Sequence, residues 1–238
     1  MIKIHEKAAR GRTQAGWLDS YHTFSFGGFS DPTRMGFGNL RVINDDTVIP
    51  GAGFAAHDHD SMDILTLVTA GHLRHEDDQG NISMIGAGEI QGMSAGSGVR
   101  HSEFNASDRD SARFLQIWLI PDEPGGAPSY VQTAVPERGD VLLAGPAASG
   151  ALIPLRSATT LTLRRFAPGG ALLLDATPGL HRFVHLLDGL AVAETERVSA
   201  GDGLQVPAGE TLALSFLTDA AVLVFDMLLT SQTKETVQ

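Results

Sequence analysis

The chain has 238 residues, enough for one large domain or two small domains with a true hydrophobic core. Its 17 Lys and Arg residues against 28 Asp and Glu give a net charge of -11, which disfavours direct binding to a nucleic-acid backbone. The absence of cysteine excludes disulfides, thiolate metal sites and cysteine nucleophiles. Without a secretory signal or a run of about 20 apolar residues, a cytoplasmic protein with no membrane span is expected.

Short runs rich in β-branched and aromatic residues follow one another along the chain, separated by glycine and proline. The clearest of these runs predict strands at 40–43, 64–68, 114–119 and 221–225. Turn signals separate others, at 78–81 (DQGN) and 87–89 (AGE). No long amphipathic helix is predicted. Many short strands with frequent turns indicate an all-β barrel or sandwich.

An internal repeat indicates that there are two such barrels. The segments 85–89 (IGAGE) and 93–96 (MSAG) recur at one constant spacing as 198–202 (VSAGD) and 206–209 (VPAG). A repeat of this length is the mark of two copies of one structural unit. The chain is therefore predicted to be an all-β protein of two related barrels.

Proline concentrates between the two copies, from Pro121 to Pro154, as expected of a segment that joins two domains. We therefore predict an N-terminal barrel over 1–125, a connector over 126–154 and a C-terminal barrel over 155–238.

Two pairs of polar residues stand out in the first copy: His57 with His59, and His101 with Glu103. Side chains two positions apart in a strand point to the same face, so each pair can direct two ligand atoms to one point. Two such strands side by side would hold three imidazoles and one carboxylate. That set suits one divalent transition metal with open coordination positions.

The second copy has no matching ligands. The positions equivalent to the two pairs hold Asp175, Thr177, Leu214 and Phe216. The C-terminal barrel is therefore predicted to keep the turns of the repeat without a metal site.

The paired segments resemble the motifs of the cupin family. Gly51 followed by His57-Asp58-His59 resembles the first motif, and Gly88 followed by Ala95-Gly96 and His101 resembles the second. Longer stretches resemble one branch of that family, the pirins; they are 16–18 (GWL), 22–26 (HTFSF), 40–44 (LRVIN), 91–98 (QGMSAGSG) and 101–105 (HSEFN).

This resemblance implies a bicupin, with two double-stranded β-helix (jelly-roll) barrels. It also implies that His57, His59, His101 and Glu103 hold one metal of the Fe(II) type in the N-terminal barrel. Some bacterial pirins are quercetin 2,3-dioxygenases, whereas the eukaryotic member is a metal-dependent transcriptional coregulator. The resemblance thus predicts the metal ligands more specifically than it predicts the reaction.

One position departs from the cupin pattern. The first motif carries a glutamate four residues after its second histidine, and here that place holds Asp63. If the strand stays regular, Asp63 shares a face with His57 and His59. It can then be a competing ligand, a hydrogen-bond partner that orients a histidine, or an acid or base in the pocket; we favour the orienting role. Glu103 and Asp63 are the predicted catalytic carboxylates.

Three functions are compatible with these residues. The leading hypothesis is a quercetin 2,3-dioxygenase-type enzyme that binds O2 and a small aromatic or enolic substrate at Fe(II), with Glu103 or Asp63 taking the enolic proton. The alternatives are a metal- or redox-sensing regulator that binds a protein partner, and a non-oxidative enzyme such as an isomerase. The same ligands also accept Zn, Ni, Mn, Co or Cu.

The remaining polar residues receive less specific predictions. His72 and His75 lie in a hairpin and are expected to be exposed or to stabilise its turn. His181 and His185 are expected to be hydrogen-bonded polar residues of the second barrel. Gln116 and Trp118 lie two apart in a predicted strand, which makes them candidates for the pocket lining.

Overall fold

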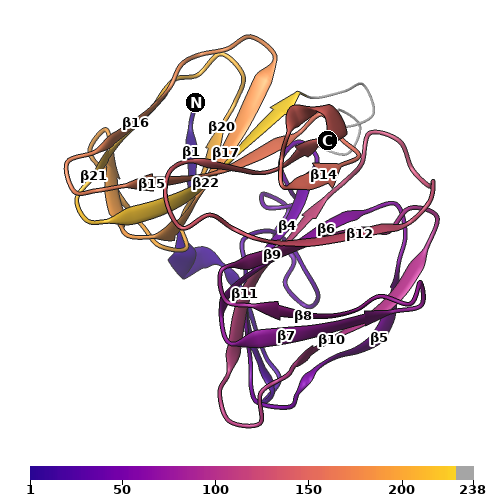
Figure 1. Cartoon of the computed structure of the whole chain (residues 1–238). Coiled ribbons are helices and arrows are strands. Elements are labelled where there is room, and N and C mark those ends of the chain that lie inside the picture. The colour runs from indigo at the N-terminus through magenta and orange to yellow at the C-terminus, as the bar shows by residue number, and fades with distance from the viewer. Residues whose placement is uncertain (229–238) are drawn as a thin grey trace.

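The computed structural model describes residues 1–228, which form four sheets, almost entirely antiparallel, arranged as two barrels (Figure 1). Each barrel pairs a seven-stranded sheet with a four-stranded one. Within the described residues the only helical elements are two 3-10 turns, η1 (Lys7–Ala9) and η2 (Ala147–Ser149). The prediction of a two-barrel, all-β protein is confirmed. Over the same residues, no helix is long and apolar enough to cross a membrane.

The N-terminal barrel is built from a large and a small sheet. Its seven-stranded sheet runs in the order β12 (Ser129–Ala134), β9 (Glu89–Ser94), β6 (Asp63–Ala70), β11 (Ala112–Leu119), β4 (Leu40–Val48), β3 (Leu18–His22) and β2 (Gly11–Gln14). Its four-stranded sheet runs in the order β5 (Gly53–His59), β10 (Val99–Asn105), β7 (His72–Asp77) and β8 (Ile82–Gly86). The predicted strands at 40–43, 64–68 and 114–119 lie in β4, β6 and β11, and the predicted turns separate β7 from β8 and β8 from β9.

The C-terminal barrel repeats this arrangement. Its seven-stranded sheet runs in the order β1 (Lys3–His5), β20 (Gly203–Val206), β17 (Leu180–Asp188), β22 (Ala220–Leu228), β15 (Thr160–Phe166), β13 (Val141–Pro146) and β14 (Ile153–Leu155). Its four-stranded sheet runs in the order β16 (Ala171–Leu174), β21 (Leu212–Phe216), β18 (Leu190–Ala193) and β19 (Glu196–Ser199). The only parallel pair within residues 1–228 is β13 with β14.

Strands cross the predicted domain boundaries in both directions. β1 pairs with β20, so the first strand of the chain belongs to the C-terminal sheet, and in Figure 1 it lies in indigo among orange and yellow strands. β12, from the predicted connector, pairs with β9 of the N-terminal sheet. β13 and β14 of the same connector join the C-terminal sheet. The segment 126–154 is therefore shared between the two sheets.

The two barrels are joined by one apolar core. Strand β11 shows how: Leu115 and Ile117 lie in a core that also contains Leu163 and Phe225 of the C-terminal sheet, while Gln116 points to the opposite side. Both faces of such a strand are covered, which explains why its sequence is a nearly continuous apolar run. The approach between the barrels is close at β9, because a Cβ on Gly92 would overlap the side chain of Ile153.

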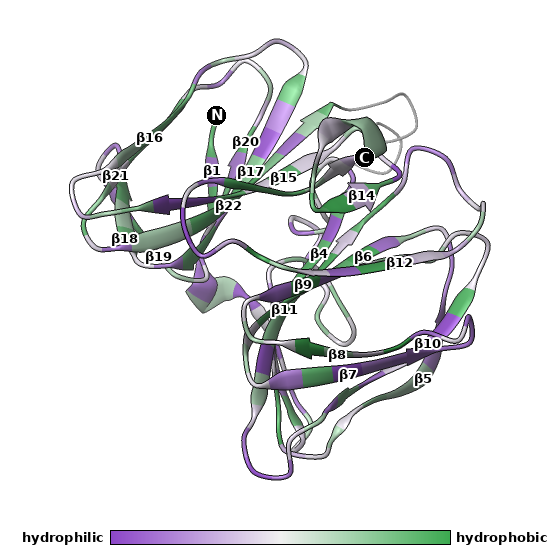
Figure 2. Cartoon of the chain, in the orientation of Figure 1, coloured by the Kyte–Doolittle hydropathy of each residue, from purple (hydrophilic) through white to green (hydrophobic). Residues whose placement is uncertain are grey.

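The interiors of the two barrels differ in polarity. In Figure 2 the strand β18 of the C-terminal barrel is mostly hydrophobic, whereas β7 of the N-terminal barrel is mostly hydrophilic. Leu214 and Phe216, the counterparts of His101 and Glu103, are both 1% exposed in an apolar cluster that fills the C-terminal barrel. The positions equivalent to His101 and Glu103 are therefore apolar in the C-terminal barrel.

Candidate metal centre

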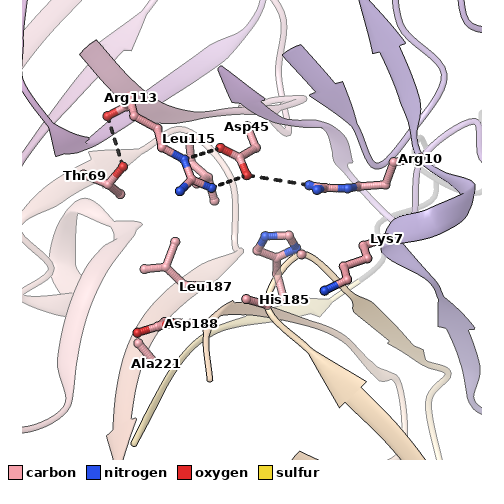
Figure 3. A pocket seen from close by; sticks show the side chains of 12 residues that line it. Lys7, Arg10, Asp45, Thr69, Arg113, Leu115, His185, Leu187, Asp188 and Ala221 are labelled. Atoms are coloured by element: carbon pink, nitrogen blue, oxygen red, sulfur yellow. Dashed lines mark hydrogen bonds and ion pairs between the residues drawn. The ribbon is translucent and has the colours of Figure 1, made fainter. Parts of the chain in front are cut away.

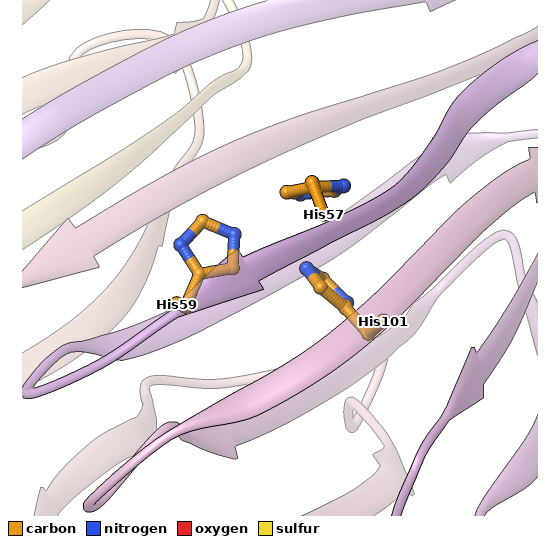
Figure 4. Close-up of side chains that lie close together, drawn as sticks. All are labelled: His57, His59 and His101. Carbon is orange, nitrogen blue, oxygen red and sulfur yellow. The ribbon is translucent and has the colours of Figure 1, made fainter.

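Neighbouring strands β5 and β10 bring three histidines together. His57 and His59 lie on β5, and in the β-ladder His57 is the direct partner of His101 on β10. One ligand nitrogen of each histidine lies within 4.8 Å of the other two. Figure 4 shows the three rings turned toward one another across the two strands. The two-residue spacing seen in the sequence thus produces one cluster of three imidazoles.

Glu103, the fourth predicted ligand, belongs to an adjoining group. The register of β10 against β5 shifts between His101 and Glu103, as at a β-bulge. Glu103 is 1% exposed, and its carboxylate lies within 4.8 Å of ligand nitrogens of His101 and His75. His101 is therefore shared between the group that faces His57 and His59 and the group that contains Glu103.

The hydrogen bonds of the histidines suit a bound metal. His57 places Nδ1 2.8 Å from the carbonyl oxygen of Ala55, which requires a proton on Nδ1 and leaves Nε2 as a lone-pair donor. His101 Nε2 is buried and has no hydrogen-bond partner among residues 1–228. Burial lowers the pKa of His59 to about 4 and that of His101 to about 3. Both rings are thus neutral at physiological pH, the form that binds a metal.

Polar side chains inside the barrel donate hydrogen bonds to Glu103. Gln91 Nε2 donates to its Oε1 at 2.5 Å, and Gln116 Nε2 donates to its Oε2 at 2.7 Å. Thr66 adds a longer contact to Oε1 at 3.4 Å. Burial raises the pKa of Glu103, while His75 and the amide donors lower it. The amides hold the carboxylate in place and offset part of the cost of burying it.

His75 is a member of the site that the sequence interpretation placed wrongly. It was expected to be exposed or turn-stabilising, but its side chain is 0% exposed. Its ring stacks on Tyr130 at 4.7 Å, and Nε2 lies 3.2 Å from Asp77 Oδ2. Nδ1 lies 3.4 Å from Nδ1 of His101. The alternation of Leu73, His75 and Asp77 along β7 was the available signal, since alternate residues share the buried face.

Two further candidates from the sequence lie next to the cluster. Gln116, on β11, is the amide donor to Glu103 described above. Trp118, two residues further along the same strand, packs edge-on against His59 with ring centroids 4.8 Å apart. Phe26 also packs edge-on against the indole of Trp118, with ring centroids 5.4 Å apart. This side of the site is an aromatic wall.

Asp63 points to different partners than the sequence suggested. β5 ends at His59, and Ser61 adopts a left-handed φ of 48°, so the strand does not continue regularly and Asp63 begins β6 in another sheet. Its Oδ2 accepts a hydrogen bond from the backbone N–H of Arg156 at 2.7 Å. Asp63 therefore contacts the segment that leads into the C-terminal barrel. Its favoured role of orienting a histidine, and its alternative role as a pocket acid or base, stay predictions.

Both groups of candidate metal ligands found within residues 1–228 lie in the N-terminal barrel. A two-barrel protein with an inward-facing histidine cluster in one barrel and an apolar filling in the other is a bicupin with one ligand-bearing barrel. Residues 4–119 match the family Pirin, and residues 142–227 match the quercetinase C-terminal cupin domain. The chain belongs to the pirin family of the cupin superfamily.

Relatives match this chain along nearly its whole length. A protein of Escherichia coli strain K12 named quercetin 2,3-dioxygenase is 36% identical over 235 residues, covering 95% of this chain and 99% of that protein. A pirin-like protein of Caulobacter vibrioides is also 36% identical and covers 91% of this chain and 95% of its own length. The crystal structure of the bacterial pirin YhhW from Escherichia coli in complex with nickel(II) has a TM-score of 0.92 and 35% identity, covering 97% of this chain and 100% of that one.

Proposed function

We propose that this protein is a metal-dependent dioxygenase of the quercetin 2,3-dioxygenase type, with Fe(II) as its metal. The observation that carries the proposal is the cluster of His57, His59 and His101, in which a buried ring nitrogen of His101 has no other partner. The names of the relatives support the reaction class, and the nickel(II) complex of YhhW supports metal binding by this fold. The absence of cysteine suits a reducing compartment, and we place the protein in the cytoplasm.

In this proposal His57, His59, His101 and Glu103 hold the metal. A divalent transition metal at this place supplies Lewis acidity, which lowers the pKa of an enolic hydroxyl, and redox chemistry toward O2. The neutral imidazoles provide nitrogen lone pairs, and the single carboxylate leaves part of the positive charge uncompensated. That remaining charge attracts the enolate form of a substrate.

The protein groups around the cluster have separate tasks. Glu103, when its carboxylate leaves the metal, is the proposed base for the enolic proton, with Asp63 as the other candidate; burial raises the pKa of both carboxyl groups. Trp118 and Phe26 present an aromatic wall beside His59, against which a flat aromatic ring can pack and exclude water. These features favour a small aromatic substrate with an enolic hydroxyl, such as a flavonol.

Oxygen uptake by metal-loaded protein tests the proposal. Protein loaded with Fe(II), and in parallel with Ni(II), is mixed with quercetin; we expect oxygen consumption and loss of flavonol absorbance at equal rates. His57→Ala removes a half-buried ligand and should abolish turnover, whereas His72→Ala removes an exposed histidine of β7 and should leave it unchanged. Fully metallated protein that consumes no oxygen with any flavonol or related enol would sink the proposal. Turnover that does not need oxygen would instead indicate a non-oxidative reaction.

A further inference from the structure

A second cavity lies at the junction of the two barrels, away from the histidine cluster. Its volume is about 660 Å³, which is within the range of small-molecule sites. Figure 3 shows Arg10, Asp45 and Arg113 along one side of the cavity, with Leu187, His185 and Lys7 on the opposite side. Neither barrel alone would form this cavity.

Among the charged residues that line the cavity, Arg10 has no close ion-pair partner. Both oxygens of Asp45 are taken by Arg113, whose Nε and Nη2 donate at 3.0 and 2.8 Å. Arg10 reaches Asp45 only at 3.9 Å, although its side chain is 8% exposed. Its Nε has no hydrogen-bond partner among the described residues. Burial lowers the pKa of Arg10 despite the nearby charges of Asp45 and Asp202. A bound anion would offset more of this desolvation.

Two more polar groups face the same space. Lys7 is anchored through its backbone N–H, which donates to Asp202 Oδ1 at 2.6 Å, and its side chain lines the cavity beside His185 (Figure 3). His185 is 2% exposed, and its Nδ1 lacks a partner within residues 1–228. Burial lowers the pKa of His185 to about 4, so the ring is neutral and can donate one hydrogen bond.

The acidic and apolar groups narrow the kind of ligand. Asp188 is exposed at the edge of the cavity, and its Oδ1 accepts from the backbone N–H of Gly189 at 2.8 Å. Three cations against two acids leave the lining with one net positive charge. Leu115, Leu187 and Ala221 provide apolar side chains in the lining, together with Thr69, Ala200 and Gly201. The lining thus offers a place for one anionic head and a short apolar body.

We propose that this interdomain cavity binds a small organic carboxylate, with the carboxylate at Arg10 and Lys7 and the apolar part against Leu115 and Leu187. The assignment is independent of the reaction at the histidine cluster. It rests on a cavity of about 660 Å³, on a largely buried guanidinium whose Nε has no hydrogen-bond partner among the described residues, and on the apolar side chains that line the same cavity.

Hexanoate is a suitable probe, because it carries one carboxylate and a short apolar chain. We expect metal-loaded protein at constant ionic strength to bind hexanoate saturably, with millimolar or tighter affinity by isothermal titration calorimetry. The neutral analogue hexanamide and inorganic phosphate should each bind at least about tenfold more weakly, since one lacks the charge and the other the apolar body. Equal binding of hexanamide, or binding of phosphate without hexanoate, would overturn the assignment.

Matched variants locate the site. Arg10→Gln should weaken hexanoate binding about tenfold or more. Arg12→Gln is the control, because Arg10 and Arg12 both lie over the ring of Tyr21, at 4.9 and 5.0 Å, but Arg12 pairs with Asp19 outside the cavity. Lys7→Gln changes an exposed side chain, and it replaces Arg10→Gln as the test variant if Arg10→Gln does not fold. Hexanoate affinity unchanged in both cavity variants would refute the proposal, as would an equal loss in Arg12→Gln.

Discussion

Replacing Gln116 by methionine tests whether the hydrogen bonds to Glu103 support metal binding. Methionine keeps the length and approximate volume of glutamine but removes its amide, so the hydrogen bond of 2.7 Å to Glu103 Oε2 is lost. Glu103 is 1% exposed, and water cannot readily replace the missing donor. The second donor, Gln91, remains on the other carboxylate oxygen. The change therefore removes one of two amide contacts and leaves the ligand residues untouched.

The expected magnitude follows from these contacts. A hydrogen bond to a charged group contributes about 1.5–3 kcal/mol. Because the Gln116 hydrogen bond lowers the pKa of Glu103, its loss should raise that pKa further. Partners that orient metal ligands typically change metal affinity by about 10–100-fold when they are removed. We therefore expect Gln116→Met to weaken Ni(II) binding at pH 7 by at least about tenfold, and by a smaller factor as the pH rises and Glu103 ionises.

Isothermal titration with Ni(II) at several pH values measures this effect. Gln132→Met is the matched control, because the Gln132 amide donates to Met84 and Glu89 and makes no hydrogen bond to Glu103. Circular dichroism confirms that both variants are folded. If Ni(II) affinity in Gln116→Met stays within about twofold of the unmodified protein at every pH, Glu103 does not contribute to metal binding as proposed.

Three further changes probe the fold around the site. Burial raises the pKa of Asp46 from 3.8 to about 7, so its contribution to stability is complete below pH 3.8 and is lost as the pH rises through 7. Asp46→Asn should therefore add on the order of 4 kcal/mol to the free energy of unfolding in urea at pH 8, and little at pH 4. The opposite trend with pH would contradict this. His75→Phe keeps an aromatic ring against Tyr130 but removes both ring nitrogens, and it should weaken Ni(II) binding by roughly tenfold. An unchanged Ni(II) affinity would exclude a role of His75 in metal binding. Gly92→Ala should lower the free energy of thermal unfolding by about 1–3 kcal/mol, and adding Ile153→Ala should recover part of this loss. Full stability of Gly92→Ala alone would refute the close approach of Gly92 and Ile153.

The local features of the fold could be predicted from the sequence because they depend on short-range patterns. Strands such as β11 and β22 are apolar runs bounded by turn residues, and the internal repeat shows that the frame occurs twice. The histidine pair on β5 meets His101 because side chains two positions apart share a face. These inferences require only the period of a strand and one pairing between strands.

The features that were missed depend on contacts between distant segments. The alternation along β7 indicates that His75 is buried, but it does not show that β7 pairs with β10, which is what brings His75 into the site. Asp63 is separated from the histidines by a turn at Ser61, where a non-glycine residue with positive φ is hard to foresee. The pairing of β1 with the C-terminal sheet joins residues about two hundred positions apart, as Lys3 with Gln205. The interdomain cavity results from the same long-range docking.

The C-terminal barrel differs from its partner in more than the loss of ligands. Its equivalents of the first histidine pair, Asp175 and Thr177, lie beyond the end of β16 at Leu174, whereas His57 and His59 lie within β5. Leu214 and Phe216 occupy the interior with apolar side chains. Histidines placed at 214 and 216 would therefore face no partner strand carrying the other half of a site, and they would bury polar rings in an apolar core. The strand geometry of the second barrel, as well as its residue types, suits it to support the first barrel through their common core.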